Sequence, residues 1–134
     1  MKVHHIGYAV KNLEQSISAF ELLGYTAGEI SSDVGRHIRI AFLQNGSECV
    51  ELVAPDGVET PVDGVLKSVG PTPYHICYEV PDMEAALADL QQSRWIVTKQ
   101  PEPAPAIGGA RVAFLYHRRV GMIELIEIEQ SEKE

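Results

Sequence analysis

The fold is decided by two stretches, HIGYAVKNLEQSISAF at residues 5–20 and HICYEVPDMEAALADL at residues 75–90. An offset of 70 residues matches the first stretch to the second. The matched pairs are His5 and His75, Tyr8 and Tyr78, Val10 and Val80, with Leu13, Ile17 and Phe20 over Met83, Leu87 and Leu90. The sequence therefore predicts an internal repeat.

Two later segments repeat in the same order with a slightly larger offset. IAFL at residues 40–43 resembles VAFL at residues 112–115, an offset of 72. VELV at residues 50–53 resembles IELI at residues 123–126, an offset of 73. Insertions in loops produce such drift, so these matches extend the repeat over most of the chain.

The first half has the pattern of one strand, one helix and three strands. Val3–Val10 alternates and is rich in residues that favour strands. Asn12 can cap the helix that follows, with Gln15 as its capping-box partner and Gly24 as its stop. The further predicted strands are Tyr25–Ser31, Ile38–Gln44 and Glu48–Val53, the last two joined at Asn45-Gly46.

The second half follows the same plan. The predicted elements are the strand Tyr74–Val80, a helix capped by Asp82, and strands near Trp95–Lys99, Arg111–Tyr116 and Met122–Ile128. Pro101, Pro103 and Pro105 predict a stiff loop between two of these strands. We expect an α+β fold of two βαβββ modules, each with a helix over one face of its sheet and the other face free to line a cleft.

The domain organisation follows from the repeat. We expect residues 1–134 to form a single domain, with modules at 1–54 and 73–129. The connector, residues 55–72, is rich in proline and glycine, and a short helix is expected around Pro61–Val69.

Four side chains at repeat-related positions predict a metal site. His5 and His75 stand at the start of each module's first strand, and Glu51 and Glu124 lie in each module's last strand. If a pseudo-twofold axis relates the modules, these two equivalent pairs can meet. Two imidazoles and two carboxylates suit Zn²⁺, Ni²⁺, Co²⁺, Fe²⁺ or Mn²⁺.

The alternation of the strands agrees with this prediction. His5 shares a face with Val3, Gly7 and Ala9, whereas Ile6, Tyr8 and Val10 take the face expected to pack on the helix. Likewise, His75 shares a face with Cys77 and Glu79. Glu51 and Glu124 interrupt apolar strands, where an unpaired buried carboxylate would be costly.

A single histidine or glutamate on a sheet face more often lies at the solvated surface than binds a metal. Only the equivalence of the four candidate ligands in the repeat favours a metal site. We read His4 as structural, His37 and His117 as surface residues, and Cys49 and Cys77 as small apolar fillers. Gly108 and Gly109 either let backbone approach a ligand or make a plain turn before the strand that begins at Arg111.

The charge composition of the chain limits which binding partners are expected. The chain has 11 Lys and Arg against 19 Asp and Glu, a formal net charge of −8. Nucleic acid and anionic membranes are therefore not expected partners. An anionic substrate would need local arginines, for which Arg36, Arg39, Arg111, Arg118 and Arg119 are available. Two cysteines, no leader-like segment and no long apolar run predict a soluble cytoplasmic protein.

Five segments resemble the vicinal oxygen chelate superfamily: HHIGYAV, VELVAP, YHICYEVPDMEAALADL, GGARVAFL and GMIELIE. The resemblance runs from Val3 to about Glu127 and is closest to methylmalonyl-CoA epimerase-like and glyoxalase I-like members. It implies an open, barrel-like sheet with a metal-binding cleft, in a homodimer. It also implies one divalent ion on His5, Glu51, His75 and Glu124.

The resemblance implies an isomerase or lyase that moves a proton α to the carbonyl of a small carbonyl or thioester substrate. The epimerase-like branch is favoured, because YHRRVGMIELIE lacks the Asp-Pro-x-Gly turn common in glyoxalase I. The alternatives are a glyoxalase I (lactoylglutathione lyase)-type enzyme and a non-catalytic binding protein of the bleomycin-resistance kind. A ring-cleaving dioxygenase, which usually needs two His and one Glu, would not require Glu51.

The resemblance also suggests catalytic and substrate-binding residues. In the epimerase-like reaction Glu124 or Asp33 would act as base, and in the glyoxalase-type reaction Glu51 or Glu124 would carry the proton. The chain departs from the epimerases at SSDVGRHIRIAFL, where they have a glutamate closely followed by glycine, and Asp33 can replace it only with a small shift. Gly108, Gly109 and Arg111 are the candidate substrate-binding residues.

Overall fold

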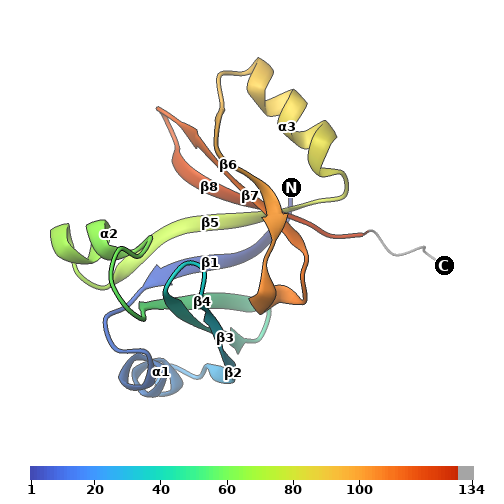
Figure 1. The fold of residues 1–134 in the computed structure, drawn as a ribbon. Coiled ribbons are helices and arrows are strands. Elements are labelled where there is room, and N and C mark those ends of the chain that lie inside the picture. The colour runs from blue at the N-terminus through green and yellow to red at the C-terminus, as the bar shows by residue number, and fades with distance from the viewer. Residues whose placement is uncertain (130–134) are drawn as a thin grey trace. The chain divides into compact units, whose positions relative to one another are not determined.

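The computed structural model describes residues 1–129, and the chain divides into two compact units (Figure 1). The first unit spans His5–Tyr74, and the second combines Met1–His4 with the chain from His75 onward. Each unit holds one of the two repeats. The α+β class and the βαβββ order of both modules are confirmed.

The first unit contains a four-stranded mixed sheet in the order β2-β3-β4-β1. Its elements are β1 (Val3–Ala9, of which the first two residues fall in the second unit), α1 (Leu13–Glu21), β2 (Thr26–Asp33), β3 (Ile38–Asn45), β4 (Glu48–Pro55) and α2 (Asp63–Ser68). β1 is parallel to β4, and β3 is antiparallel to both of its neighbours. The helix α2 matches the short helix expected in the connector.

The helix α1 begins as the sequence predicts. Asn12 accepts the Gln15 N–H at 2.9 Å through its side-chain oxygen, which satisfies a backbone donor of the first turn. The apolar stripe of α1 packs on one face of the sheet. That core comprises Tyr8, Val10, Leu13, Ile17, Phe20, Tyr25, Ala27, Ala41, Leu43, Val50, Leu52 and Ala54. The bulky face of β1 therefore lies against the helix, as predicted.

The second unit repeats this arrangement with the strand order β5-β8-β7-β6. Its elements are β5 (Thr72–Val80), α3 (Met83–Gln92), β6 (Ile96–Pro103), the 3-10 turn η1 (Pro105–Ile107), β7 (Arg111–His117) and β8 (Gly121–Glu127). Asp82 caps α3 by accepting the Ala85 N–H at 3.1 Å. Tyr78, Val80, Met83 and Leu87 lie in the core between α3 and the sheet.

One expectation about this unit is wrong. Pro101 and Pro103 were expected in a loop, but β6 continues through both to Pro103. β6 is the edge strand of its unit's sheet, where a missing N–H costs no ladder bond on the open side. The pairing with β7 shifts register on both sides of Lys99, which accommodates the prolines.

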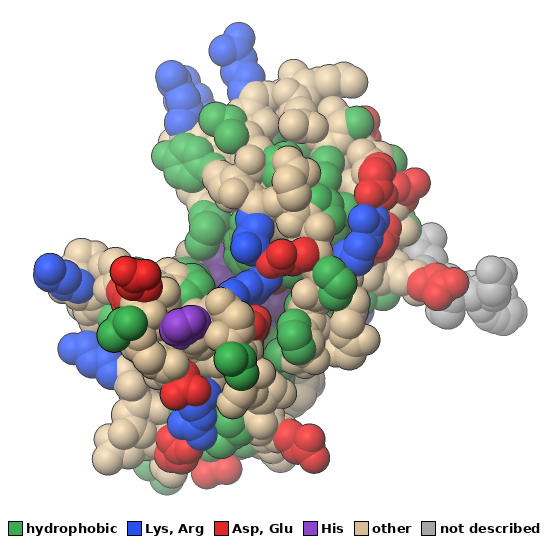
Figure 2. Space-filling model, viewed as in Figure 1, with side chains coloured by type: hydrophobic (Ala, Val, Ile, Leu, Met, Phe, Trp, Pro, Cys, Tyr) green, Lys and Arg blue, Asp and Glu red, His purple; other side chains and the backbone are tan. Residues whose placement is uncertain are grey.

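Acidic and basic side chains are interspersed on the face shown in Figure 2, without a broad basic patch. Within residues 1–129, no helix has the length and apolar character needed to cross a membrane.

Candidate metal centre

The first unit places His5 and Glu51 in contact. Glu51 on β4 pairs in register with Gly7 on β1, two residues after His5, so both side chains lie on the sheet face opposite α1. His5 Nε2 lies 3.2 Å from Glu51 Oε1. Both residues are buried, with exposures of 1% for His5 and 7% for Glu51.

The second unit builds the equivalent pair from the equivalent strands. Glu124 on β8 pairs in register with Cys77 on β5, two residues after His75. His75 Nε2 lies 2.9 Å from Glu124 Oε1. His75 is 5% exposed and Glu124 is 4% exposed. The equivalence expected from the repeat is thus matched by the same contact in each unit.

A phenylalanine completes each pair, and sequence reasoning missed its role. Phe42 pairs in register with Glu51, and Phe114 pairs with Glu124. The His5 and Phe42 rings meet edge to face at 5.2 Å, and the His75 and Phe114 rings do so at 5.6 Å. The two phenylalanines occupy equivalent positions in the repeated segments IAFL and VAFL. The repeat therefore pointed to them, but nothing in the sequence alone indicated that they contact the histidines.

Each histidine–glutamate pair has the donor atoms that a divalent metal ion requires. A carboxylate removed from water needs a cation or hydrogen-bond donors nearby. A neutral imidazole nitrogen and a carboxylate oxygen are both ligands of zinc and of the neighbouring first-row divalent ions. Each unit therefore presents one nitrogen and one oxygen donor side by side on a buried strand face. That both pairs bind the same ion stays a prediction.

Asp33 lies on the same sheet face as the first pair. It ends β2 and pairs in register with Ile38, which shares a face of β3 with Phe42. Its side chain is 13% exposed. Arg36 donates its backbone N–H to Asp33 at 3.2 Å, and Arg36 Nε lies 3.7 Å from the other carboxylate oxygen. The Arg36 contacts keep this carboxylate in one orientation.

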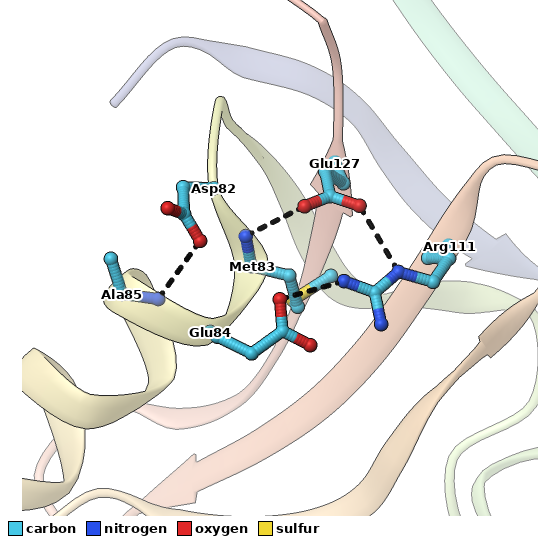
Figure 3. Close-up of polar contacts among 6 residues, drawn as sticks. All are labelled: Asp82, Met83, Glu84, Ala85, Arg111 and Glu127. Carbon is cyan, nitrogen blue, oxygen red and sulfur yellow. Dashed lines mark hydrogen bonds and ion pairs between the residues drawn. The ribbon is translucent and has the colours of Figure 1, made fainter.

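Arg111 takes part in an ion-pair network at the start of α3 (Figure 3). Its Nε donates to Glu127 at 3.0 Å, and a second guanidinium nitrogen donates to Glu84 at 2.9 Å. Glu127 also accepts the Met83 N–H at 2.9 Å. Arg111 lowers the pKa of both carboxyl groups. Its proposed contact with substrate stays a prediction.

The first unit contains a simpler version of this network, which sequence reasoning also missed. Arg39 on β3 forms a two-point ion pair with Glu14 in the first turn of α1. Glu14 and Glu84 are 70 residues apart, and Arg39 and Arg111 are 72 apart, the offsets of their repeats. The repeat therefore carries a link between helix and third strand. The sequence alone indicated these two arginines only as possible ligands of an anionic substrate.

Gly108 and Gly109 lie in the turn that follows η1. Both have positive φ, of 64° and 86°, which glycine adopts without strain. The loop around them packs Ala104, Ile107 and Ala110 over Cys77, Val112 and Ile126. These three strand residues share the face of His75 and Glu124, so the loop closes over part of the candidate face. Contact of the two glycines with substrate remains a prediction.

The cysteines behave as small apolar residues. Cys77 is completely buried and contributes to the cluster under this loop. Burial, followed by the charge of Glu51, raises the pKa of Cys49 to about 11. Its thiol is therefore protonated at neutral pH and is a poor metal ligand there.

Comparison with known proteins identifies the family. The model for the glyoxalase/bleomycin resistance protein/dioxygenase superfamily matches residues 4–114. The mitochondrial methylmalonyl-CoA epimerase of Mus musculus is 29% identical over 97% of this chain and 73% of its own length. The ethylmalonyl-CoA/methylmalonyl-CoA epimerase of Cereibacter sphaeroides is 29% identical over 96% of this chain and 97% of its own length.

A solved structure has the same fold. It is a variant of Streptomyces coelicolor methylmalonyl-CoA epimerase in complex with 2-nitronate-propionyl-CoA. The two structures superpose with a TM-score of 0.82 at 22% identity, covering 98% of this chain and 99% of the other. The fold is therefore the same, and the match to the family model shows that the chain belongs to the glyoxalase/bleomycin resistance protein/dioxygenase superfamily.

Proposed function

We propose that this protein is a divalent-metal-dependent isomerase or lyase of the methylmalonyl-CoA epimerase type, which moves a proton at the carbon α to a carbonyl. The observation that carries the proposal is the pair of equivalent, buried imidazole–carboxylate contacts, one in each unit. The epimerase relatives, 29% identical over nearly the whole chain, support the reaction type. Their names and the CoA ligand of the related structure support a CoA thioester as substrate.

In this proposal His5, Glu51, His75 and Glu124 hold one ion, which can be Zn²⁺, Ni²⁺, Co²⁺, Fe²⁺ or Mn²⁺. When bound, the ion supplies Lewis-acid polarisation of a substrate carbonyl oxygen, which makes the adjacent C–H bond more acidic. The two phenylalanines keep the imidazoles oriented, since each contacts a ring edge to face.

The proton transfers fall to carboxylates of this chain. We assign the base to Asp33 or Glu124, because both are carboxylates on the faces that carry the metal-binding pairs. Asp33 has the better arrangement for this role, because Arg36 orients it and its carboxylate is not one of the four ligands. A second carboxyl group in its protonated form would donate a proton to the opposite face of the α-carbon, which gives epimerisation.

Elemental analysis tests the metal first. We expect about one divalent ion per chain in the wild type and its loss in both His5→Ala and Glu124→Ala. The control is Glu29→Ala, which removes an exposed carboxylate of β2 and should keep the ion. Absence of metal from the wild type, even after addition of divalent ions, would sink the enzyme proposal and leave a binding protein.

The reaction is tested separately by exchange of the α-proton of methylmalonyl-CoA in D₂O, followed by NMR. Exchange that depends on the metal supports the epimerase type. Metal-dependent binding of the thioester without exchange would instead favour the sequestering proteins of the superfamily.

A glyoxalase-type lyase is the second candidate, because Glu51 is a carboxylate in contact with His5 and could move a proton itself. Glu51→Gln separates the two candidates. An epimerase should keep its metal and much of its activity, whereas a glyoxalase-type enzyme should lose most of its activity.

The family resemblance also supports a single domain built from both units and a homodimer. Sedimentation equilibrium would report the assembly, and one cooperative unfolding transition would report the single domain.

A further inference from the structure

Three exposed apolar side chains form a row across the sheet of the second unit. Ile96 on β6 pairs in register with Tyr116 on β7, and Tyr116 pairs with Met122 on β8. Their exposures are 61%, 43% and 38%. Residues paired in register point to the same side of a sheet, so these side chains form one continuous strip, called here the apolar row.

The apolar row lies on the face of the candidate metal ligands. Met122 stands two residues before Glu124 on β8, and Tyr116 stands two residues after Phe114 on β7, so strand alternation gives all four the same face. β5 and β8 are parallel, with Ile76 paired to Ile123. Continuing that register by one residue sets Met122 beside His75. The row therefore starts at a candidate ligand and runs outward to the sheet edge.

In the first unit, the three positions equivalent to the apolar row carry different residues. Thr26 pairs with Gln44, and Gln44 pairs with Cys49, in the same order across β2, β3 and β4. The offsets to the apolar row are 70, 72 and 73, those of the repeat. The fold thus accommodates threonine, glutamine and cysteine here. Exposed isoleucine, tyrosine and methionine in the second unit are not a requirement of the strand geometry.

We propose that the apolar row contacts an alkyl chain attached at the reacting carbon of the substrate, and that it sets a preference for longer acyl groups. This inference rests on the proposed function and names the part of the thioester that this strip recognises. An alkyl chain suits the row because the row adjoins His75 and presents an isoleucine, the ring of a tyrosine and a thioether. A protein partner suits it less, since a stable interface needs about 800 Å² on each side, more than three side chains expose.

Methionine NMR tests the contact directly. The chain has three methionines, of which Met122 lies in the row and Met83 is fully buried in the core under α3. Protein labelled with ¹³C at the methionine methyl groups and loaded with Zn²⁺ is titrated with acetyl-CoA, hexanoyl-CoA and octanoyl-CoA. We expect the Met122 signal to move increasingly with chain length while the Met83 signal stays in place.

The affinity for the same thioesters provides the second readout. Each methylene that the row buries should tighten binding roughly three- to fourfold. The double variant Ile96→Thr, Tyr116→Gln copies two positions of the first unit and keeps Met122 as reporter. It should flatten this dependence and leave acetyl-CoA binding unchanged. Val120→Thr is the matched control, because Val120 is 61% exposed in the turn beside the row.

The outcomes separate this inference from the proposed function. Octanoyl-CoA that binds without moving the Met122 signal overturns the apolar row as an acyl contact, whatever the enzyme's activity. A Met122 signal that changes on dilution of the protein alone assigns the row to self-association and also overturns it. If octanoyl-CoA shifts Met122 but no metal-dependent proton exchange occurs, the row stands and the epimerase proposal fails.

Discussion

At the scale of single residues, each candidate imidazole is held from two sides. A carboxylate lies at its Nε2, and a phenylalanine meets its ring edge to face. Edge-to-face aromatic contacts contribute about 0.5–1.5 kcal/mol beyond the area that they bury. We therefore expect each phenylalanine to favour the ring orientation that points the imidazole nitrogen at the carboxylate.

This orientation gives the first prediction. Phe114→Leu should weaken divalent-ion binding several-fold and lower the free energy of unfolding by about 1–2 kcal/mol. The measurements are a competition titration with a metal-sensitive dye and urea unfolding of the metal-free protein. Leu87→Ala removes core volume on the helix side and should destabilise the fold while leaving ion affinity nearly unchanged. Equal ion affinity in Phe114→Leu and the wild type would contradict the orienting role.

The second prediction concerns the base. Asp33→Asn should keep the bound ion and lower α-proton exchange by roughly 100-fold or more, because a general base contributes about that much. Arg36→Met should lower exchange less, since it loosens the carboxylate without removing it. The readout is deuterium exchange of the α-proton, followed by NMR. Full activity of Asp33→Asn would move the role to Glu124.

At the scale of elements, the start of α3 is fastened by more than its cap. Asp82 accepts one N–H, and Glu127 on β8 accepts another while it binds Arg111 on β7. The sequence predicted the cap, because a cap is a local pattern. It did not predict Glu127, whose partner Met83 lies 44 residues away. The extent of β6 was missed for the same reason, because it depends on contacts that are distant in the sequence. Its prolines are tolerated because the strand lies at a sheet edge.

Glu127 leads to a prediction about pH. Its pKa is lowered from 4.5 by the Arg111 side chain and then by the Met83 N–H, so its charged form is favoured in the folded state. This contribution is present above about pH 4.5 and is lost as the pH falls through the lowered folded-state pKa. Glu127→Gln should therefore be less stable than the wild type at pH 7 and lose less stability between pH 5 and pH 3.

Thermal unfolding across that range measures the effect. The control is Glu29→Gln, which removes an exposed carboxylate of β2 and should follow the wild-type curve. Parallel curves for Glu127→Gln and the wild type would mean that the Arg111 contact contributes nothing in solution.

At the scale of the whole molecule, the repeat made the site predictable. No single residue among His5, Glu51, His75 and Glu124 distinguishes itself from ordinary strand residues. Their equivalence in the repeat does, and the structure places the two pairs on equivalent strands, with the same register step and the same contact. The repeat could not predict the positions at which its halves differ, as they do at the apolar row, because there the two halves carry different residues at equivalent strand positions.

The last prediction separates one shared ion from one ion per unit. An ion that binds only the folded state stabilises it by RT ln(1 + [L]/Kd), about 2.7 kcal/mol at 100 times Kd. If both pairs hold one ion, His5→Ala should abolish the whole thermal shift, although the His75–Glu124 pair is untouched. If each unit held its own ion, the wild type would bind about two, and His5→Ala would keep roughly half of the bound metal. Thermal unfolding with and without chelator, read beside elemental analysis, decides between them. The shared ion also predicts that His75→Ala and His5→Ala have equal effects, since each variant removes one of the two nitrogen donors of a single site.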